Sequence, residues 1–116
     1  MKEKNLQEGS TVKKKSLKLT SKQVRYLRGL GHRVSPKVLI GHEGITGKLL
    51  DSLEAVLVAN ELIKIKILGN SGVDRQEAAQ IIAASTQANV LQVLGRTILI
   101  YRENKDKKPD KKIQLP

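Results

Sequence analysis

Leu39-Ile40-Gly41-His42-Glu43-Gly44-Ile45-Thr46 is the stretch that decides how this chain folds, because a short apolar strand runs there through a Gly-x-x-Gly turn into a capped helix. Glycine lets the backbone approach a ligand closely and adopt dihedral angles that other residues avoid. The first turn of the following helix adds N–H groups without intrahelical partners and a positive dipole end. The stretch therefore predicts a strand, a turn and a helix that together can hold an anion such as phosphate.

Upstream of this stretch the sequence predicts a helix and a short strand. Thr20-Ser21-Lys22-Gln23 matches a capping box, in which the first and last side chains satisfy each other's backbone amides. The apolar residues that follow at helical spacing, and the glycines that limit the helix, are Val24, Leu27, Leu30, Gly29 and Gly31. Residues 37–40 then form a strand that leads into the glycine loop.

Downstream, Thr46 is positioned to cap a second helix, and Asn60 is expected to end it in a left-handed conformation. The stripe expected to face the core of that helix consists of Leu49, Leu50, Leu53, Val56 and Leu57. From Glu61 the pattern changes to alternation, which predicts a strand over residues 62–67 with its isoleucines on one face and Lys64 and Lys66 on the other.

A third helix and a β-hairpin complete the predicted elements. Asp74-Arg75-Gln76-Glu77 opens the helix as a capping box, and its apolar residues are Ala78, Ala79, Ile81, Ile82 and Ala83. Residues 90–94 and 97–101 are strands separated only by Gly95-Arg96, the length and composition of a tight hairpin turn.

The two-residue turn also predicts which hairpin side chains share a face, because it pairs the two residues that flank it. One face is then expected to carry Leu91, Val93, Ile98 and Ile100 toward the helix-covered core. The opposite, mixed face is expected to carry Val90, Gln92, Leu94, Thr97, Leu99 and Tyr101, together with the lysines of the strand at residues 62–67.

The resulting order, α-β-α-β-α-β-β, predicts a single compact layered α/β domain with a four-stranded mixed sheet. Right-handed crossovers through the second and third helices make the first three strands parallel or mixed, and the last pair is antiparallel. The order of the strands in the sheet stays open at this point.

Composition limits the possible functions. The 116 residues include 22 Lys and Arg against 11 Asp and Glu, and this net charge of +11 indicates a partner rich in phosphate. Aromatic residues make up only 2%, so base stacking on aromatic platforms is not expected. Cysteine is absent, which excludes disulfides and thiolate sites and favours a reducing, cytoplasmic location. No apolar run approaches the roughly 18 residues that a bilayer crossing needs, so no membrane partner is expected.

Three segments follow from the distribution of charge. Residues 1–19 are predicted to form a flexible basic arm, residues 20–102 the folded domain, and residues 103–116 a basic tail whose final residues either dock or stay mobile. The domain contains eleven basic and six acidic residues, a balance of +5, so the basic character is not confined to the ends of the chain.

Several motifs, taken in order, resemble the CRM domain, the chloroplast RNA splicing and ribosome maturation module. They are residues 19–23, 27–32, 38–46, 61–66 and 93–102, and the similarity extends to the terminal residues 111–116 of the bacterial stand-alone YhbY-like form. The resemblance implies an RNA-binding domain with a fold like that of the carboxy-terminal domain of translation initiation factor three. It also implies an association of bacterial members with precursors of the large ribosomal subunit, and of plant relatives with group II intron splicing.

The candidate RNA-binding residues are the glycines and histidine of the loop and the bases around it: Lys22, Arg25, Arg28, Arg33, Lys37, Gly41, His42, Gly44, Lys48, Lys64, Lys66, Arg96 and Arg102. Each has a simpler alternative. The loop can be a tight turn without a ligand, the bases of the first helix a solvated face, and the lysines of the sheet a guard against edge association. Many relatives place basic residues between the two glycines, whereas His42 and Glu43 stand there in this chain.

Neither catalysis nor metal binding is expected. His32 and His42 have no cysteine and no clear carboxylate partner, and no nucleotide-binding loop, nucleophile elbow or matched carboxylate pair is present. The sequence therefore predicts a non-enzymatic protein, without cofactor, that binds structured ribosomal RNA during assembly of the large subunit. The alternative is an adaptor that docks on a ribosomal or assembly-factor protein through the mixed sheet face, with RNA contact secondary.

Overall fold

The computed structural model describes residues 18–116, so the predicted N-terminal arm lies outside the described residues except for its last two positions. The predicted order of elements is confirmed, with a short 3₁₀ helix added near the C-terminus. The elements are α1 (Ser21–Gly31), β2 (Val38–Ile40), α2 (Gly47–Asn60), β3 (Leu62–Ile67), α3 (Arg75–Thr86), β4 (Asn89–Leu94), β5 (Thr97–Tyr101) and η2 (Pro109–Lys111).

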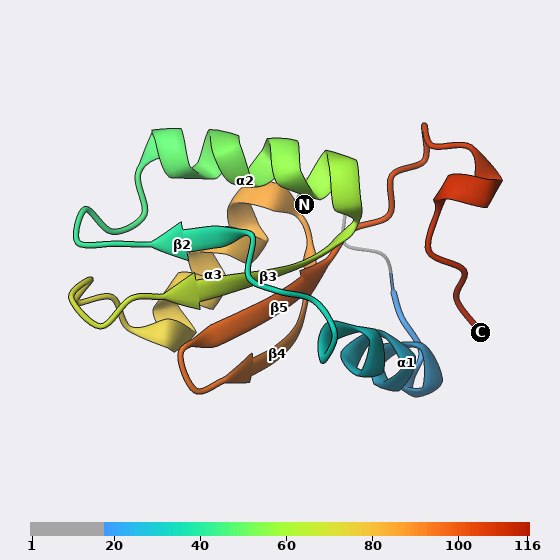
Figure 1. The fold of residues 1–116 in the computed structure, drawn as a ribbon, viewed down its shortest axis with the longest axis horizontal. Helices are drawn as coiled ribbons and strands as arrows, with labels where there is room; N and C mark the ends of the chain where they lie inside the picture. The colour runs from blue at the N-terminus through green and yellow to red at the C-terminus, as the bar shows by residue number, and fades with distance from the viewer. Residues whose placement is uncertain (1–17) are drawn as a thin grey trace, which may run out of the picture.

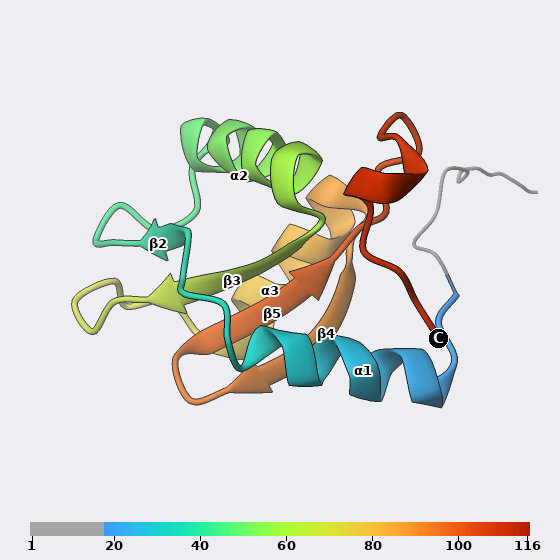
Figure 2. The same ribbon diagram turned by 45° about the vertical axis from the view of Figure 1, so that its right-hand side comes forward.

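The four strands form one mixed sheet in the order β2-β3-β5-β4. β2 and β3 are parallel, whereas β5 runs antiparallel to both of its neighbours. Helices cover both faces: α2 and α3 lie on one side of the sheet and α1 crosses the other (Figures 1 and 2). The predicted α/β layered architecture is confirmed, and the structure adds the strand order.

Local capping explains where the helices begin. Thr20 Oγ1 accepts a hydrogen bond from the Gln23 amide at 3.1 Å, and Gln23 Oε1 accepts one from the Thr20 amide at 3.0 Å. Thr46 Oγ1 accepts from the Leu49 amide at 3.1 Å, and Asp74 Oδ2 accepts from the Glu77 amide at 2.9 Å. The predicted first turns of all three α-helices are therefore confirmed by side-chain contacts.

The main core lies between the sheet and the α2–α3 layer. It is entirely aliphatic, and the isoleucines of β3 point into it as the alternating pattern predicts. Its large members are Val38, Ile40, Leu53, Leu57, Ile63, Ile65, Ile67, Ile82, Ile98 and Ile100. Ile81, one of the apolar residues of α3, is not among them, because it is 42% exposed on the outside of the helix.

A second apolar cluster lies on the opposite face of the sheet, beneath α1. Its buried members are Leu27, Leu62, Leu91, Leu99 and Tyr101, and Ile113 and Leu115 of the C-terminal tail pack against it. The face expected to be mixed is therefore partly closed by a helix and by the tail. The phenol of Tyr101, expected on that mixed face, is only 1% exposed.

One hairpin prediction was wrong because β4 contains an irregularity. The pairing of β4 with β5 shifts between Val90 and Gln92, which leaves Leu91 as the extra residue of a β-bulge. The extra residue reverses the alternation, so Leu91 joins the cluster under α1 and Val90 pairs with Ile100. From Gln92 to Tyr101 the predicted facing holds.

The predicted end of the second helix was also wrong by one position. Asn60 remains in α2, where its Nδ2 donates to the Val56 carbonyl at 2.9 Å. The residue with positive φ is Glu61, at 66°. The Glu61 side chain is buried, and its carboxylate accepts from the Asn104 amide at 2.8 Å and from the Ile113 amide at 2.9 Å.

Of the two alternatives for the tail, the structure shows docking. Besides its contacts with Glu61, the tail forms a Lys112–Glu103 ion pair at 3.0 Å. At the last residue, the Pro116 carbonyl accepts from Gln23 Nε2 at 3.2 Å, next to the start of α1. The C-terminus therefore lies beside α1 in both views of the fold (Figures 1 and 2).

Candidate nucleic-acid interface

The Gly41–Gly44 loop is a tight turn between β2 and α2. The Gly44 amide donates to the Gly41 carbonyl at 2.9 Å, and Gly44 has a φ of +72°, which favours glycine at this position. Gly41 differs, because its φ is not positive and an added Cβ would meet no atom within 4 Å. The fold therefore requires a glycine at position 44, whereas nothing in the surrounding structure requires one at position 41.

An open hollow of about 410 Å³ lies beside this loop. Its lining combines the loop, with its exposed residues His42 and Glu43, the apolar residues Leu39 and Leu49, and the polar residues Thr46, Lys48 and Ser52. The amides of Gly47 and Lys48 stand in the first turn of α2, where helix geometry provides no acceptor. The hollow thus unites a cation, a helix N-terminus and an apolar wall, which suit an anionic ligand with an apolar part, whereas the carboxylate of Glu43 in the same lining opposes one.

The predicted bases of α1 and the following linker lie on one layer of the molecule. Lys22, Arg25, Arg33 and Lys37 are exposed. Arg28 is also exposed, but its Nε donates to the Leu91 carbonyl at 2.9 Å, where the β-bulge leaves the ladder irregular. Arg28 therefore has a structural role in fastening α1 to β4, which its helical spacing did not indicate.

The two lysines of β3 point to the same face as α1. Lys66 is exposed, whereas Lys64 is half-buried in a small hollow of about 120 Å³ at the end of α1. Arg96 is exposed at the tip of the β4–β5 hairpin, where it lines another hollow together with Asp74 and Arg75. The sheet therefore adds cations to those of α1.

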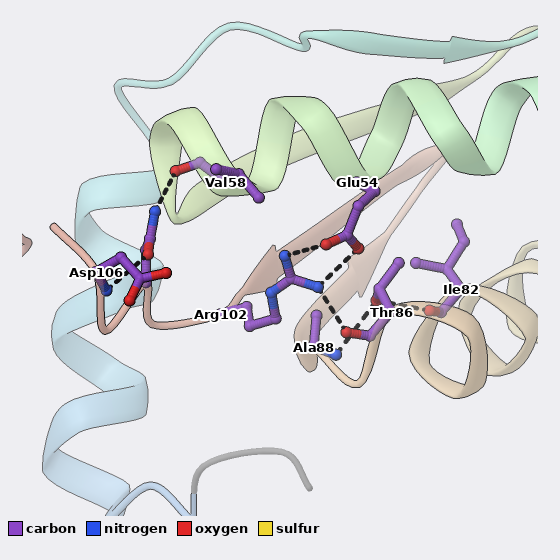
Figure 3. A network of polar contacts seen from close by, with 8 residues as sticks. Glu54, Val58, Ile82, Thr86, Ala88, Arg102 and Asp106 are labelled. Atoms are coloured by element: carbon purple, nitrogen blue, oxygen red, sulfur yellow. Dashed lines mark hydrogen bonds and ion pairs between the residues drawn. The ribbon is translucent and has the colours of Figure 1, made fainter. Parts of the chain in front are cut away.

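Arg102 lies apart from these residues. Its guanidinium forms a bidentate pair with Glu54, at 2.8 and 2.7 Å, and Nη1 also donates to the Thr86 carbonyl at 2.9 Å (Figure 3). The same figure shows the neighbouring contact between the tail and the Val58 carbonyl. This network joins α2, α3 and β5, so the guanidinium is engaged in holding the layers together.

Within residues 18–102, the acidic residues lie apart from the bases of α1, the linker and β3. No acidic residue occurs from Lys18 to His42, nor in any of the four strands. The acids between residues 43 and 102, apart from the buried Glu61, belong to the α2–α3 layer or to the loops that lead into it: Glu43, Asp51, Glu54, Asp74 and Glu77. We call the opposite side the basic face, defined by Lys22, Arg25, Arg28, Arg33, Lys37, Lys64 and Lys66; the elements that supply these residues contain no acid, and the acids on this side are those of the tail.

Sequence reasoning missed two exposed leucines on this side. Leu39 is 53% exposed and Leu94 is 63% exposed, at the two outer strands of the sheet. The alternation in β2 was the available signal for Leu39, since its neighbours Val38 and Ile40 both point into the core. For Leu94, the signal was its pairing with Thr97 across the hairpin turn.

Within residues 18–116, no three side chains of the types that bind metals come together. His32 and His42 both lie on the surface, His42 in the glycine loop and His32 just after α1. None of the helices in this part of the chain combines the length and the apolar character that crossing a membrane requires.

Comparisons with known proteins agree on one family. The model of the CRS1 / YhbY (CRM) domain matches residues 19–102. The probable RNA-binding protein YqeI of Bacillus subtilis is 33% identical over 98 residues, which cover 84% of this chain and 99% of that protein. An RNA-binding protein of Haemophilus influenzae is 35% identical, with 84% and 95% covered. The solution structure of the hypothetical protein SAV1595 from Staphylococcus aureus superposes with a TM-score of 0.69 at 39% identity, covering 85% of this chain and 100% of that one.

Proposed function

The chain belongs to the CRS1 / YhbY (CRM) domain family, and on this premise we propose that it binds RNA through the basic face and the Gly41–Gly44 loop. The observation that carries the proposal is the separation of charge across the sheet. The basic face attracts a polyanion and orients it, while the α2–α3 layer, which carries the acids of residues 43–102 other than Glu61 or follows the loops that carry them, faces the other way. The names of the relatives, which are RNA-binding proteins, support the same ligand class.

The proposed binding mode relies on backbone contacts. Lys22, Arg25 and Arg33 supply exposed charge, and Lys48 with the first-turn amides of α2 receives a phosphate beside the loop. The fold does not require a glycine at position 41, so the proposed role of Gly41 is to let the RNA backbone come close. We propose no catalytic step for this surface.

A loop variant tests this role of Gly41 without disturbing the fold. Gly41→Ala adds a methyl group where no atom lies within 4 Å, so we expect an unchanged thermal transition and an RNA affinity lowered about fivefold. Gly69→Ala is the matched control, because a Cβ there also meets nothing within 4 Å and its φ is not positive. Equal affinities for the two variants would show that the loop is only a turn.

The RNA that we propose as the ligand is ribosomal RNA in precursors of the large subunit, in line with the resemblance to bacterial CRM proteins. Sucrose-gradient sedimentation of a lysate, with and without nuclease, tests this assignment. We expect the protein to migrate with large-subunit precursors and to leave them after nuclease treatment. Recovery only at the top of a low-salt gradient would refute the ribosomal part of the proposal while leaving RNA binding itself open to direct assay.

A further inference from the structure

The α1 side of the sheet is only half covered, and the boundary is set by the end of α1. Gly31, the last residue of α1, packs so tightly on β5 that an added Cβ would lie 2.6 Å from Leu99 Cδ2. The strand residues before and after this contact are therefore in different environments. Tyr101 is buried under α1 and the tail, whereas Thr97, at the other end of β5, stands beyond the helix.

The uncovered half is one continuous row across all four strands. Leu39 pairs with Lys66, Lys66 pairs with Thr97, and Thr97 pairs with Leu94. Since residues directly opposite each other in a ladder share a face, these four side chains stand side by side. With strands about 4.8 Å apart, the row spans roughly 14 Å. We call it the open row.

Each end of the open row borders a hollow. Leu39 lines the hollow of about 410 Å³ at the glycine loop. Leu94 and Thr97 line the hollow of about 120 Å³ at the end of α1, together with His32 and Gln92. The open row thus connects the loop to the end of α1, with Lys66 in its middle.

From this arrangement we infer that the open row binds the bases of an unpaired RNA segment that leaves the loop and crosses the sheet. The inference rests on the proposed function and names its ligand class. A paired A-form helix offers phosphates and hydroxyl groups at its surface, so the two exposed leucines at the ends of the row gain nothing from it. Unpaired bases present apolar faces and carry a phosphate each, and the open row offers both kinds of contact: a leucine at each end and the Lys66 cation between them.

The chemistry of the open row also favours RNA over a protein partner. Its only ionisable side chain is Lys66, and Arg33 and Lys37, exposed in the linker on the same side, are basic as well. The one nearby carboxylate is that of Glu43, which lines the hollow at the Leu39 end of the row. The segment crossing it must therefore be apolar and anionic at once along its length. A nucleic acid strand meets this requirement in every residue.

The test uses a short mixed-sequence RNA, alone and annealed to its complement, with the full-length protein. In the double variant Leu39→Ser, Leu94→Ser we expect an affinity about tenfold lower for the single strand and unchanged for the duplex. The control is Val58→Ser, because Val58 is 46% exposed on α2, in the opposite layer. All of the replaced side chains are exposed, so the thermal transitions should stay cooperative.

The outcomes separate this inference from the proposed function. An unchanged affinity of the double variant for both probes, as a surface for a protein would give, overturns the inference. An equal loss for both probes overturns it as well. Wild-type protein that binds neither probe refutes the proposed function itself. Photocrosslinking of a thiouridine-substituted single strand gives a second measurement: we expect adducts in residues 37–40 and 94–99, and adducts confined to α1 would contradict the inference.

Discussion

Glu43 is the one residue of the glycine loop that opposes the proposed ligand. Glu43 is exposed and lines the same hollow as Lys48, and a negative charge there repels phosphate. We predict that Glu43→Gln raises the RNA affinity about threefold at moderate salt, measured by fluorescence anisotropy. Asp106→Asn is the matched control, since it removes the same charge from an exposed position in the tail. An equal gain in both variants would mean that net charge alone acts, without a phosphate near the loop.

Tyr101 links the burial of one residue to the pH dependence of stability. Burial, with the nearby Glu61 and Glu103 carboxylates, raises the pKa of Tyr101 to about 12 from an ordinary value of 10.0. The folded protein therefore keeps the phenol proton above pH 10, where the unfolded chain releases it. By linkage, the stability from this group is complete below pH 10 and is lost as the pH rises toward 12, by about 2 kcal/mol.

Lysines also titrate between pH 10 and pH 12, so the wild type must be compared with a variant that lacks the Tyr101 phenol. Urea unfolding of the wild type and of Tyr101→Phe at pH 9 and about pH 11.5 isolates the tyrosine, because the variant lacks this contribution. In a Tyr26→Phe background, tyrosinate absorbance then reports the pKa of Tyr101 alone. A midpoint near pH 10 would show that the α1 side does not exclude water from the phenol.

At the scale of elements, the sequence predicted what depends on near neighbours. The caps at Thr20, Thr46 and Asp74 and the alternation of β3 involve residues only a few positions apart, so their patterns are legible. The β-bulge at Leu91 is different, because its contacts are with residues of α1 far away in the chain. The Leu91 carbonyl accepts from Arg28, and the Leu91 side chain lies in the same cluster as Leu27. A two-residue hairpin turn predicts strict alternation of side chains, and no local feature of the sequence indicates the β-bulge that interrupts it.

The tail shows the same limit. Glu61 followed a helix in the sequence and carried no sign that its carboxylate accepts from two amides located 43 and 52 positions later. The residues of the candidate interface were predicted from charge alone. Arg102 was included among them because its ion-pair partner, Glu54, is also far away in the sequence, so no local pattern indicated the pair. The contacts of Glu61 with the tail and of Arg102 with Glu54 both join residues far apart in the sequence. Predicting them requires the strand order, which the sequence left open.

The tail contacts give a prediction about stability. Glu61→Ala leaves the amides of Asn104 and Ile113 without their acceptor, and we expect the free energy of unfolding in urea to fall by about 3 kcal/mol. Glu61→Gln, which keeps one acceptor oxygen, should lose less. Deletion of residues 103–116 should couple strongly to Glu61→Ala, because both changes remove the same contacts. Additive losses would show that the tail and Glu61 stabilise the domain independently.

At the scale of the whole molecule, the fold gathers basic residues on one side of the sheet, so that the excess of positive charge has a defined orientation. Within residues 18–102, the bases of the basic face come from α1, the linker and β3, and the acids, apart from Glu61, from the helices that cover the other face and the loops that lead into them. Composition alone predicted a polyanionic partner, but it could not predict this separation, which requires knowing that α1 lies opposite α2 and α3. The adaptor alternative is restricted by the same architecture, since α1 and the tail occupy half of the sheet face on which a protein was expected to dock.

Salt dependence distinguishes the two functions and locates the charge that matters. If phosphate contacts dominate, the logarithm of the RNA affinity falls linearly with the logarithm of salt concentration, each contact adding somewhat less than one to the slope. We predict that Lys22→Ala, Arg25→Ala, Arg33→Ala together reduce the slope by about two and the affinity at physiological salt at least tenfold. Arg28 is left in place because its Nε supports the β-bulge at Leu91.

The matched control for this variant is Lys105→Ala, Lys108→Ala, Lys111→Ala, which removes the same charge from exposed tail positions. Its slope should change less, because these lysines belong to the tail rather than to the helix and linker of the basic face. Equal changes in both variants would mean that RNA responds to net charge and not to a defined surface. A wild-type slope near zero would instead favour docking on a protein, since contacts with few phosphates are almost insensitive to salt.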